Sequence, residues 1–257
     1  MTYVTSSYLS GLKPRLTPRD LAITAEVGRF KLMTASQILR VFFQEPHRSE
    51  LSRARRCQAV LSRLTKHGVL ARLEERDETK SFIYCLDIAG QRIAEQVSKR
   101  PRRKYAWYSP LIWHTLAIAE LWVRLIEAHR AGELILHAFE TEPRCWREFS
   151  GLRLKPDAYI ELDEVEGDKR YRSNFYIEID RGTQYGTKVT SKLPAYNAFW
   201  NHLEATGRKS RGALILTRNE TRSAYLMRKI GQESELTRSM YSVAIFDDAL
   251  FMLSPRK

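Results

Sequence analysis

The chain has 257 residues, which is enough for one large domain or two domains of ordinary size. Its 43% hydrophobic content can form packed cores, and a net charge of +13 favours a polyanionic partner. The three cysteines, Cys57, Cys85 and Cys145, include no C-x-x-C pair, which argues against a disulfide framework or a structural zinc site and fits a reducing cytoplasm. No N-terminal signal segment or membrane-length apolar stretch is present, so we expect a cytoplasmic protein without a membrane span.

The basic charge is concentrated in the N-terminal part of the chain. Residues 1–104 hold 21 Lys and Arg against 10 Asp and Glu, whereas residues 105–257 hold 22 against 20. The local excess of +11 predicts that double-stranded DNA binds mainly through the N-terminal part. An anionic membrane surface, or a role in solubility alone, is the alternative reading of the same charge.

Helix and strand signals follow one another in this part. Residues 1–16 lack them and are expected to form a flexible arm. Thr17 is a helix N-cap with proline at the first helical position, and Thr34 has capping-box spacing. The predicted elements are helices from Thr17 and from Thr34, a helix over about 49–66, strands over about 69–73 and 81–86, and a helix from Asp87 to about residue 97.

This order is typical of a winged helix-turn-helix, which we place at residues 17–99. In that module the third helix enters the major groove and the hairpin touches the adjacent backbone. The candidate DNA contacts are therefore the cations of the third helix, Arg53, Arg55, Arg56, Arg63 and Lys66. The alternative is that these side chains only solvate one face of an amphipathic helix.

A basic linker is expected at residues 100–104, which contain a proline and no apolar side chain. Its Arg102, Arg103 and Lys104 are further candidate phosphate contacts. Beyond it, residues 105–257 show a long helix and then strands and helices in the order β-β-β-α-β-α-β. This order predicts a second domain of the α/β (α+β) class with a mixed sheet.

Two predicted strands of that domain carry acidic residues. Asp157 begins one strand, and Glu178 and Asp180 lie two apart on the next, so the latter two point to the same face of the sheet. If the strands pair as a hairpin, Asp157 lies near Glu178. Converging carboxylates repel one another unless a cation lies between them, and oxygen ligands of this kind suit Mg²⁺ or Mn²⁺. A metal site in a basic protein suggests phosphodiester chemistry.

The helix and strand order, with Pro156-Asp157 and Glu178-x-Asp180, resembles the PD-(D/E)XK restriction-endonuclease-like core. The resemblance implies that Asp157 and Glu178 bind the metal together with the Ile179 carbonyl, and that Glu120 is the helix acid. Asp180 stands where that motif has its lysine, so Asp180 is an additional ligand or the lysine has moved. The candidates for the moved lysine are Lys188 and Lys192, and with Arg181 they are candidates for stabilising transition-state charge.

A resemblance over nearly the whole chain is to the replication-relaxation family, which is similar to MOBC-type plasmid relaxases. It rests on the winged helix, the basic linker, the helix with His114 and Glu120, and the Asp180-Arg181-Gly182-Thr183 segment. It implies an enzyme that nicks plasmid or mobile-element DNA at an origin, for replication or transfer, with Mg²⁺ or Mn²⁺ and with protein partners in a nucleoprotein complex. Transposase subunits with a nuclease core and a winged helix are a more distant similarity.

Other readings stay open. One alternative is that the three acids are ordinary surface carboxylates. Another is that the protein is a winged-helix accessory or regulatory factor with a degenerate nuclease domain. Tyr185 and Tyr196 lie near the acidic strand as candidate nucleophiles or as packing residues, and His114 is a candidate for the site or a half-buried structural histidine. The histidine spacing does not suit a tyrosine-histidine relaxase. The sequence leaves the oligomeric state open.

Overall fold

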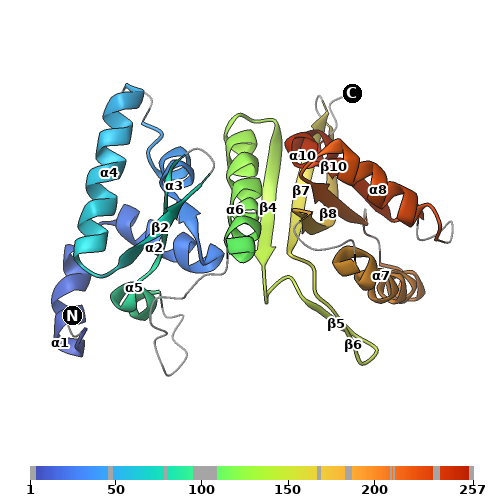
Figure 1. Ribbon diagram of the computed structural model, residues 1–257, viewed down its shortest axis with the longest axis horizontal. Helices are drawn as coiled ribbons and strands as arrows, with labels where there is room; N and C mark the ends of the chain where they lie inside the picture. The colour runs from blue at the N-terminus through green and yellow to red at the C-terminus, as the bar shows by residue number, and fades with distance from the viewer. Residues whose placement is uncertain are drawn as a thin grey trace. The chain divides into compact units, whose positions relative to one another are not determined.

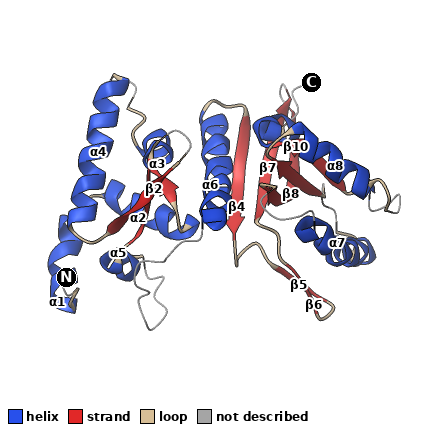
Figure 2. Cartoon of the chain, viewed as in Figure 1, coloured by secondary structure: helices blue, strands red, loops and turns tan. Residues whose placement is uncertain are grey.

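A computed structural model describes residues 4–45, 49–77, 80–94, 109–166, 169–182, 187–208, 210, 212–233 and 238–254. The chain has a mixed α+β fold and divides into two compact units, Met1–Val123 and Arg124–Lys257 (Figures 1 and 2). The fold class predicted from the sequence is confirmed at this level. No helix in the described parts of the chain combines the length and the apolar character needed to cross a membrane.

The N-terminal unit is mainly helical. Its elements are α1 (Ser6–Leu12), η1 (Lys13–Arg15), α2 (Pro18–Phe30), β1 (Met33–Thr34), α3 (Ala35–Phe42), α4 (Glu50–Lys66), β2 (Leu70–Arg76), β3 (Phe82–Leu86), α5 (Ile88–Ile93) and the first part of α6 (Ser109–Arg130). The three strands form an antiparallel sheet in the order β1-β3-β2. Helices α2 and α3 begin as predicted, because Thr17 and Thr34 each form a capping box with the third residue of the helix.

Within the segment expected to be a flexible arm, residues 6–15 form α1 and η1. The side chain of Thr5 caps α1 by accepting a hydrogen bond from the Tyr8 amide. Leu12 and Leu16 are buried, and the Tyr8 hydroxyl donates to the His67 carbonyl at 3.1 Å. The segment is thus held by apolar burial and by a contact distant in sequence, neither of which a local pattern shows.

The division between the units differs from the boundary expected at residues 100–104, which lie outside the described residues. Ile112 and Leu116 of α6 pack in one core with Leu32 and Ile83 of the N-terminal unit. The first turns of α6 therefore belong to that unit, and the division falls inside α6.

The C-terminal unit is built on a five-stranded sheet in the order β10-β9-β8-β7-β4. Its elements are the end of α6, β4 (Leu134–Thr141), β5 (Arg147–Phe149), β6 (Leu152–Leu154), β7 (Ala158–Glu166), β8 (Lys169–Asp180), α7 (Thr187–Ala205), β9 (Ala213–Thr217), α8 (Glu220–Ile230), β10 (Tyr241–Ile245), η2 (Phe246–Asp248) and α10 (Ala249–Leu253). Strands β8, β9 and β10 are parallel neighbours, whereas β7 is antiparallel to both β4 and β8. Strands β5 and β6 form a separate hairpin that the sequence pattern did not predict.

Helices α7 and α8 cover one face of this sheet (Figure 1). Tyr196 and Trp200 of α7 pack on Tyr176 of β8, and Leu193 of α7 meets Leu226 of α8 over Ile215 of β9. Side chains two apart on a strand share a face. Glu178 and Asp180 follow Tyr176 at two-residue intervals on β8, so they also point toward these helices.

Candidate active site

Asp157 lies directly before β7 and is fixed by the neighbouring strand. Its amide donates to the Ile177 carbonyl at 3.0 Å, and its Oδ2 accepts a hydrogen bond from the Ile179 amide at 2.7 Å. The side chain is buried beside β8. The predicted pairing of the two acidic strands is confirmed, because β7 and β8 form one antiparallel hairpin with Ala158 opposite Ile177.

Glu178 is the centre of the site, and only 2% of its surface is exposed. Its Oε2 lies 2.5 Å from the Lys192 ammonium, and its Oε1 accepts a hydrogen bond from the Tyr196 hydroxyl at 2.8 Å. Lys192 Nζ also lies 3.6 Å from Asp157 Oδ1 and donates to the Lys155 carbonyl at 3.0 Å. We refer to Asp157, Glu178 and Lys192 as the acid–lysine cluster.

Burial and mutual charge shift the pKa values of the acid–lysine cluster. Burial raises the pKa of Glu178 to about 8, and the Asp157 carboxylate adds to the rise. Burial lowers the pKa of Lys192, but the Glu178 and Asp157 carboxylates outweigh it, so this pKa is raised. Two carboxylates share one ammonium, and further positive charge here would stabilise their ionised forms.

Lys192, one of the two candidate lysines of α7, contacts both acids. Of the two lysines proposed to have moved from the strand to the helix, Lys192 reaches both carboxylates from the second turn of α7. Lys188 lies in the first turn of α7, and its side chain is outside the described part of the chain. The position of Lys192 agrees with the predicted move, and its catalytic role stays a prediction.

Asp180 is engaged outside the acid–lysine cluster. Its two carboxylate oxygens accept hydrogen bonds from Arg222 of α8 at 2.8 and 3.1 Å, and Oδ1 also accepts from the Gly182 amide at 2.8 Å. An internal guanidinium thus neutralises Asp180, and the metal-ligand role predicted for it stays a prediction. The next residue, Arg181, is partly exposed at the end of β8.

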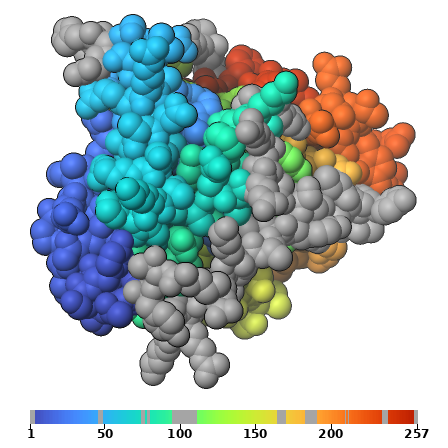
Figure 3. Space-filling model, turned by 60° about the vertical axis from the view of Figure 1, so that its left-hand side comes forward, coloured from blue at the N-terminus to red at the C-terminus, as the bar shows by residue number. Residues whose placement is uncertain are grey.

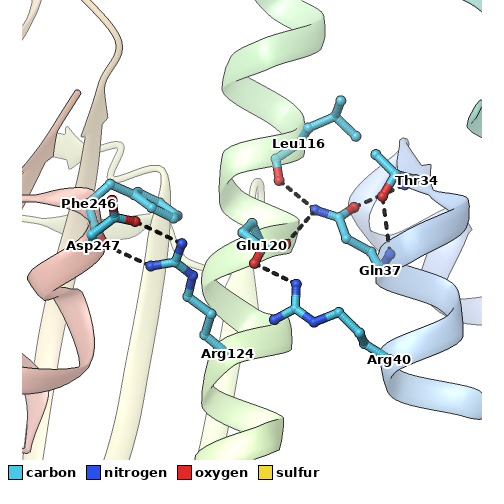
Figure 4. A network of polar contacts seen from close by, with 8 residues as sticks. All are labelled: Thr34, Gln37, Arg40, Leu116, Glu120, Arg124, Phe246 and Asp247. Atoms are coloured by element: carbon cyan, nitrogen blue, oxygen red, sulfur yellow. Dashed lines mark hydrogen bonds and ion pairs between the residues drawn. The ribbon is translucent and has the colours of Figure 1, made fainter. Parts of the chain in front are cut away.

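Glu120 belongs to the N-terminal unit, in which α3 binds its carboxylate (Figure 4). Arg40 Nη1 lies 2.7 Å from Glu120 Oε1, and Gln37 Nε2 donates to Glu120 Oε2 at 3.1 Å. Gln37 also donates to the Leu116 carbonyl at 3.1 Å. These contacts give Glu120 partners that fix α6 to α3, while its predicted metal role is untested. His114 is partly buried on the same helix.

Tyr196, a candidate nucleophile or packing residue, is buried. It is 1% exposed, and burial, with the Glu178 and Asp157 carboxylates, raises its pKa well above the usual value. A phenol in this position is a poor nucleophile because its ionised form is strongly disfavoured. Its hydrogen bond indicates a role in positioning Glu178. Tyr185, the other candidate, lies outside the described residues.

The cations predicted to bind DNA differ in their surroundings on α4. Arg55 and Lys66 are exposed, whereas Arg53 donates to Gln44 at 2.7 Å and Arg56 pairs with Glu45 at 3.3 Å. Arg102, Arg103 and Lys104 lie outside the described residues.

Arg63 is partly exposed and pairs with a buried acid of α2. Its Nη2 lies 2.8 and 2.9 Å from the two carboxylate oxygens of Asp20, which is fully buried. Arg63 therefore neutralises a buried acid, and this internal contact was not expected for a residue proposed to face DNA.

The sequence pattern of the replication-relaxation family matches residues 25–213, well over half of the chain. The chain belongs to the replication-relaxation family. The matched range contains α4 and the whole acid–lysine cluster, and the family resemblance inferred from the sequence is confirmed. Membership of this family indicates a role in DNA replication or relaxation. No curated protein and no solved structure matches the chain.

Two contacts of this replication-relaxation protein were not predicted from its sequence. Tyr196 follows Lys192 by four residues on α7, so helical spacing places both on one face and would have indicated a shared partner. No such sequence signal exists for the contact between Arg222 and Asp180, because it depends on the tertiary packing of α8 on the sheet.

The oxygen donors of Asp157 and Glu178 fit a hard divalent cation by their chemistry. They are two buried carboxylates beside the backbone of β8, and because burial raises the pKa of Glu178, a bound cation would favour its ionised form. Within the described residues, no group of three or more His, Cys, Asp or Glu side chains is placed to hold a metal ion. A metal would therefore take these two acids, with the remaining ligands from the backbone, water or DNA.

Proposed function

We propose that this protein is a Mg²⁺- or Mn²⁺-dependent endonuclease that nicks plasmid or mobile-element DNA at an origin. The observation that carries the proposal is the convergence of Asp157, Glu178 and Lys192 on one buried point. Two carboxylates and a lysine on a sheet and its covering helix are the groups that the PD-(D/E)XK resemblance implies. Family membership supports DNA as the substrate.

The order of elements supports the same proposal. The chain runs from α6 through β4, β7 and β8 to α7 and β9, which is the α-β-β-β-α-β order of the PD-(D/E)XK core, with the β5–β6 hairpin inserted. The two acids lie at neighbouring positions, Asp157 directly before β7 and Glu178 on β8, as that core requires. The lysine comes from α7 in place of the strand, and Asp180 instead anchors Arg222.

Each residue of the acid–lysine cluster has a distinct task in this proposal. Asp157 and Glu178 would hold the metal ion, which when bound supplies a Lewis acid for phosphodiester hydrolysis. Lys192 carries its proton on Nζ between the two carboxylates, where it orients the attacking water or meets the developing charge on the phosphate. Tyr196 holds the Glu178 carboxylate in one orientation through its hydroxyl.

We further propose that the N-terminal unit binds duplex DNA as a winged helix, with α4 in the major groove. Its order of three helices and a hairpin supports this assignment. Figure 3 shows the outer side of α4 at the molecular surface. The exposed residues on this helix include, at helical spacing, Arg55, Gln58, Ser62 and Lys66. Two cations for phosphates and two polar side chains for base edges are the chemistry that duplex recognition uses.

Conversion of supercoiled plasmid to the open circle, with Mg²⁺ or Mn²⁺, tests the nuclease. We expect Asp157→Asn and Glu178→Gln each to reduce nicking by at least about a hundredfold, because each removes a carboxylate that the metal and its transition state require. DNA binding measured without metal should be unchanged. Glu204→Gln, at an exposed position of α7, is the matched control and should nick like the parent. Asp180→Asn should be nearly as damaging as Asp157→Asn if Asp180 is a metal ligand, and should retain activity if Asp180 only anchors Arg222. Parent-level nicking by Asp157→Asn and Glu178→Gln would refute the nuclease proposal.

The second candidate function is a DNA-binding accessory factor with a degenerate nuclease domain. This candidate is favoured because both carboxylate oxygens of Glu178 already have hydrogen-bond partners within the protein, Lys192 and Tyr196. Thermal unfolding with and without Mn²⁺ separates the two candidates, because a metal that binds only the folded protein raises its melting temperature. An increase that disappears in Glu178→Gln supports the nuclease, and no increase in the parent supports the accessory factor.

A further inference from the structure

The β5–β6 hairpin has two different faces. On one face, Phe149 and Leu154 pack against Phe199 and Leu203 of α7, which fixes the hairpin to the C-terminal unit. Side chains alternate across a strand, so the neighbours of these residues point the other way. The hairpin is not hydrogen-bonded into the five-stranded sheet, and Figure 1 shows it extending away from that sheet.

The outer face of the hairpin holds two cations over one indole ring. Lys155 Nζ lies 4.9 Å and Arg153 Cζ lies 5.8 Å from the centre of the Trp146 ring. Both cations are exposed. Among the described residues Lys155 has no carboxylate partner, and Arg153 pairs only with the exposed Glu148 at 2.9 Å. An exposed ion pair contributes little free energy, so a phosphate can replace Glu148.

This face is joined to the acid–lysine cluster by the backbone. The chain runs from Lys155 through Pro156 into Asp157, and the Lys155 carbonyl accepts the hydrogen bond from Lys192. The thiol of Cys145, next to Trp146, donates to the Pro156 carbonyl at 3.0 Å. A strand of DNA lying on Arg153 and Lys155 is therefore held two residues from a carboxylate of the proposed catalytic site.

We propose that Trp146, Arg153 and Lys155 form a second DNA-binding surface, which holds the phosphate backbone beside the scissile bond. This inference rests on the proposed nuclease function. Aromatic rings with adjacent cations are a common surface for nucleic-acid strands, because the cations meet phosphates and the ring supports a base or the cation itself. This surface positions the substrate, and the chemical step belongs to the acid–lysine cluster.

The test measures binding of a 30-base-pair duplex to the full chain in EDTA at several salt concentrations. The double variant Arg153→Ala/Lys155→Ala should give a log–log salt slope less steep by about 1.8, because each lost phosphate contact removes about 0.9. Lys229→Ala, which removes an exposed cation of α8, is the control and should keep the parent slope. Arg153→Lys/Lys155→Arg keeps both charges and should also keep the slope.

A parent-like slope in the double variant overturns the inference, as does an equal loss of slope in Lys229→Ala. These binding results do not depend on cleavage, so they decide the surface even if the parent fails to nick plasmid. Where the parent nicks, the double variant should need several-fold more DNA for half-maximal rate and should retain the maximal rate. A loss of maximal rate alone, with parent-like binding, also contradicts a positioning role.

Discussion

At the scale of single residues, Tyr196 shows why the acid–lysine cluster has one arrangement. Its hydroxyl is the partner of Glu178 Oε1 in a buried environment, where an unpaired oxygen costs about 1–3 kcal/mol. Lys192 and Tyr196 thus satisfy the two carboxylate oxygens separately, and neither can replace the other.

We expect Tyr196→Phe to lower the free energy of unfolding by about 1–3 kcal/mol, because it leaves Glu178 Oε1 without a donor. Urea unfolding without metal measures this loss. Tyr171→Phe, at an exposed position of β8, is the matched control and should unfold like the parent. In the nicking assay Tyr196→Phe should retain measurable activity, and complete inactivity with parent-like stability would favour Tyr196 as the nucleophile.

Two arginines of α4 should separate stability from binding. Arg63→Ala leaves the buried Asp20 carboxylate without its guanidinium, so we expect a loss of about 1–3 kcal/mol in the free energy of unfolding. Arg55→Ala removes an exposed side chain and should leave stability unchanged while weakening duplex binding several-fold. Thermal unfolding and duplex titration of both variants provide the comparison. Equal effects of the two variants on binding and on stability would mean that the separate roles assigned to Arg63 and Arg55 are wrong.

At the scale of elements, the sequence predicted those helix and strand positions that depend on residues close together along the chain. Thr17 and Thr34 start their helices because a capping box needs only residues three apart. The β5–β6 hairpin was missed because its strands are three residues long and carry charges on the outer face, which resembles a loop. Helix α1 was missed because Leu12 and Leu16 owe their burial to tertiary contacts.

The candidate site follows the same rule. The proximity of Asp157 to Glu178 was predictable, because a hairpin fixes which residues of two strands are neighbours. The contact of Lys192 with Glu178 and the pairing of Asp180 with Arg222 depend on how α7 and α8 pack on the sheet. No pattern along the chain determines that packing.

At the scale of the whole molecule, the division inside α6 decides which fragments fold. A fragment ending at residue 104 lacks Ile112 and Leu116, which complete the core around Leu32 and Ile83. It also lacks Trp122, whose ring lies 4.9 Å from that of Phe30. The N-terminal unit therefore needs part of α6, although that helix begins beyond the predicted linker.

We accordingly expect a fragment of residues 1–130 to be more stable than one of residues 1–104 by roughly 3–6 kcal/mol, the value of burying two aliphatic side chains. Thermal unfolding of the two fragments measures the difference. A fragment of residues 1–130 in which Ile112 and Leu116 are both replaced by Ala should resemble the shorter one. Equal melting temperatures for the two parent fragments would place the boundary back at residues 100–104.

Because Lys192 and Tyr196 lie on the same helix, the position of an insertion in α7 determines its effect on the acid–lysine cluster. An α-helix turns by about 100° per residue, so one residue inserted within α7 ahead of Lys192 rotates both side chains away from Glu178 together. The same insertion after Tyr196 leaves both in place but rotates Phe199, Trp200 and Leu203 out of the core. Single-residue insertions scanned along α7 should therefore change in effect at one turn of the helix, from loss of the acid–lysine cluster to loss of stability alone. We expect α7 to tolerate changes of length only beyond Leu203.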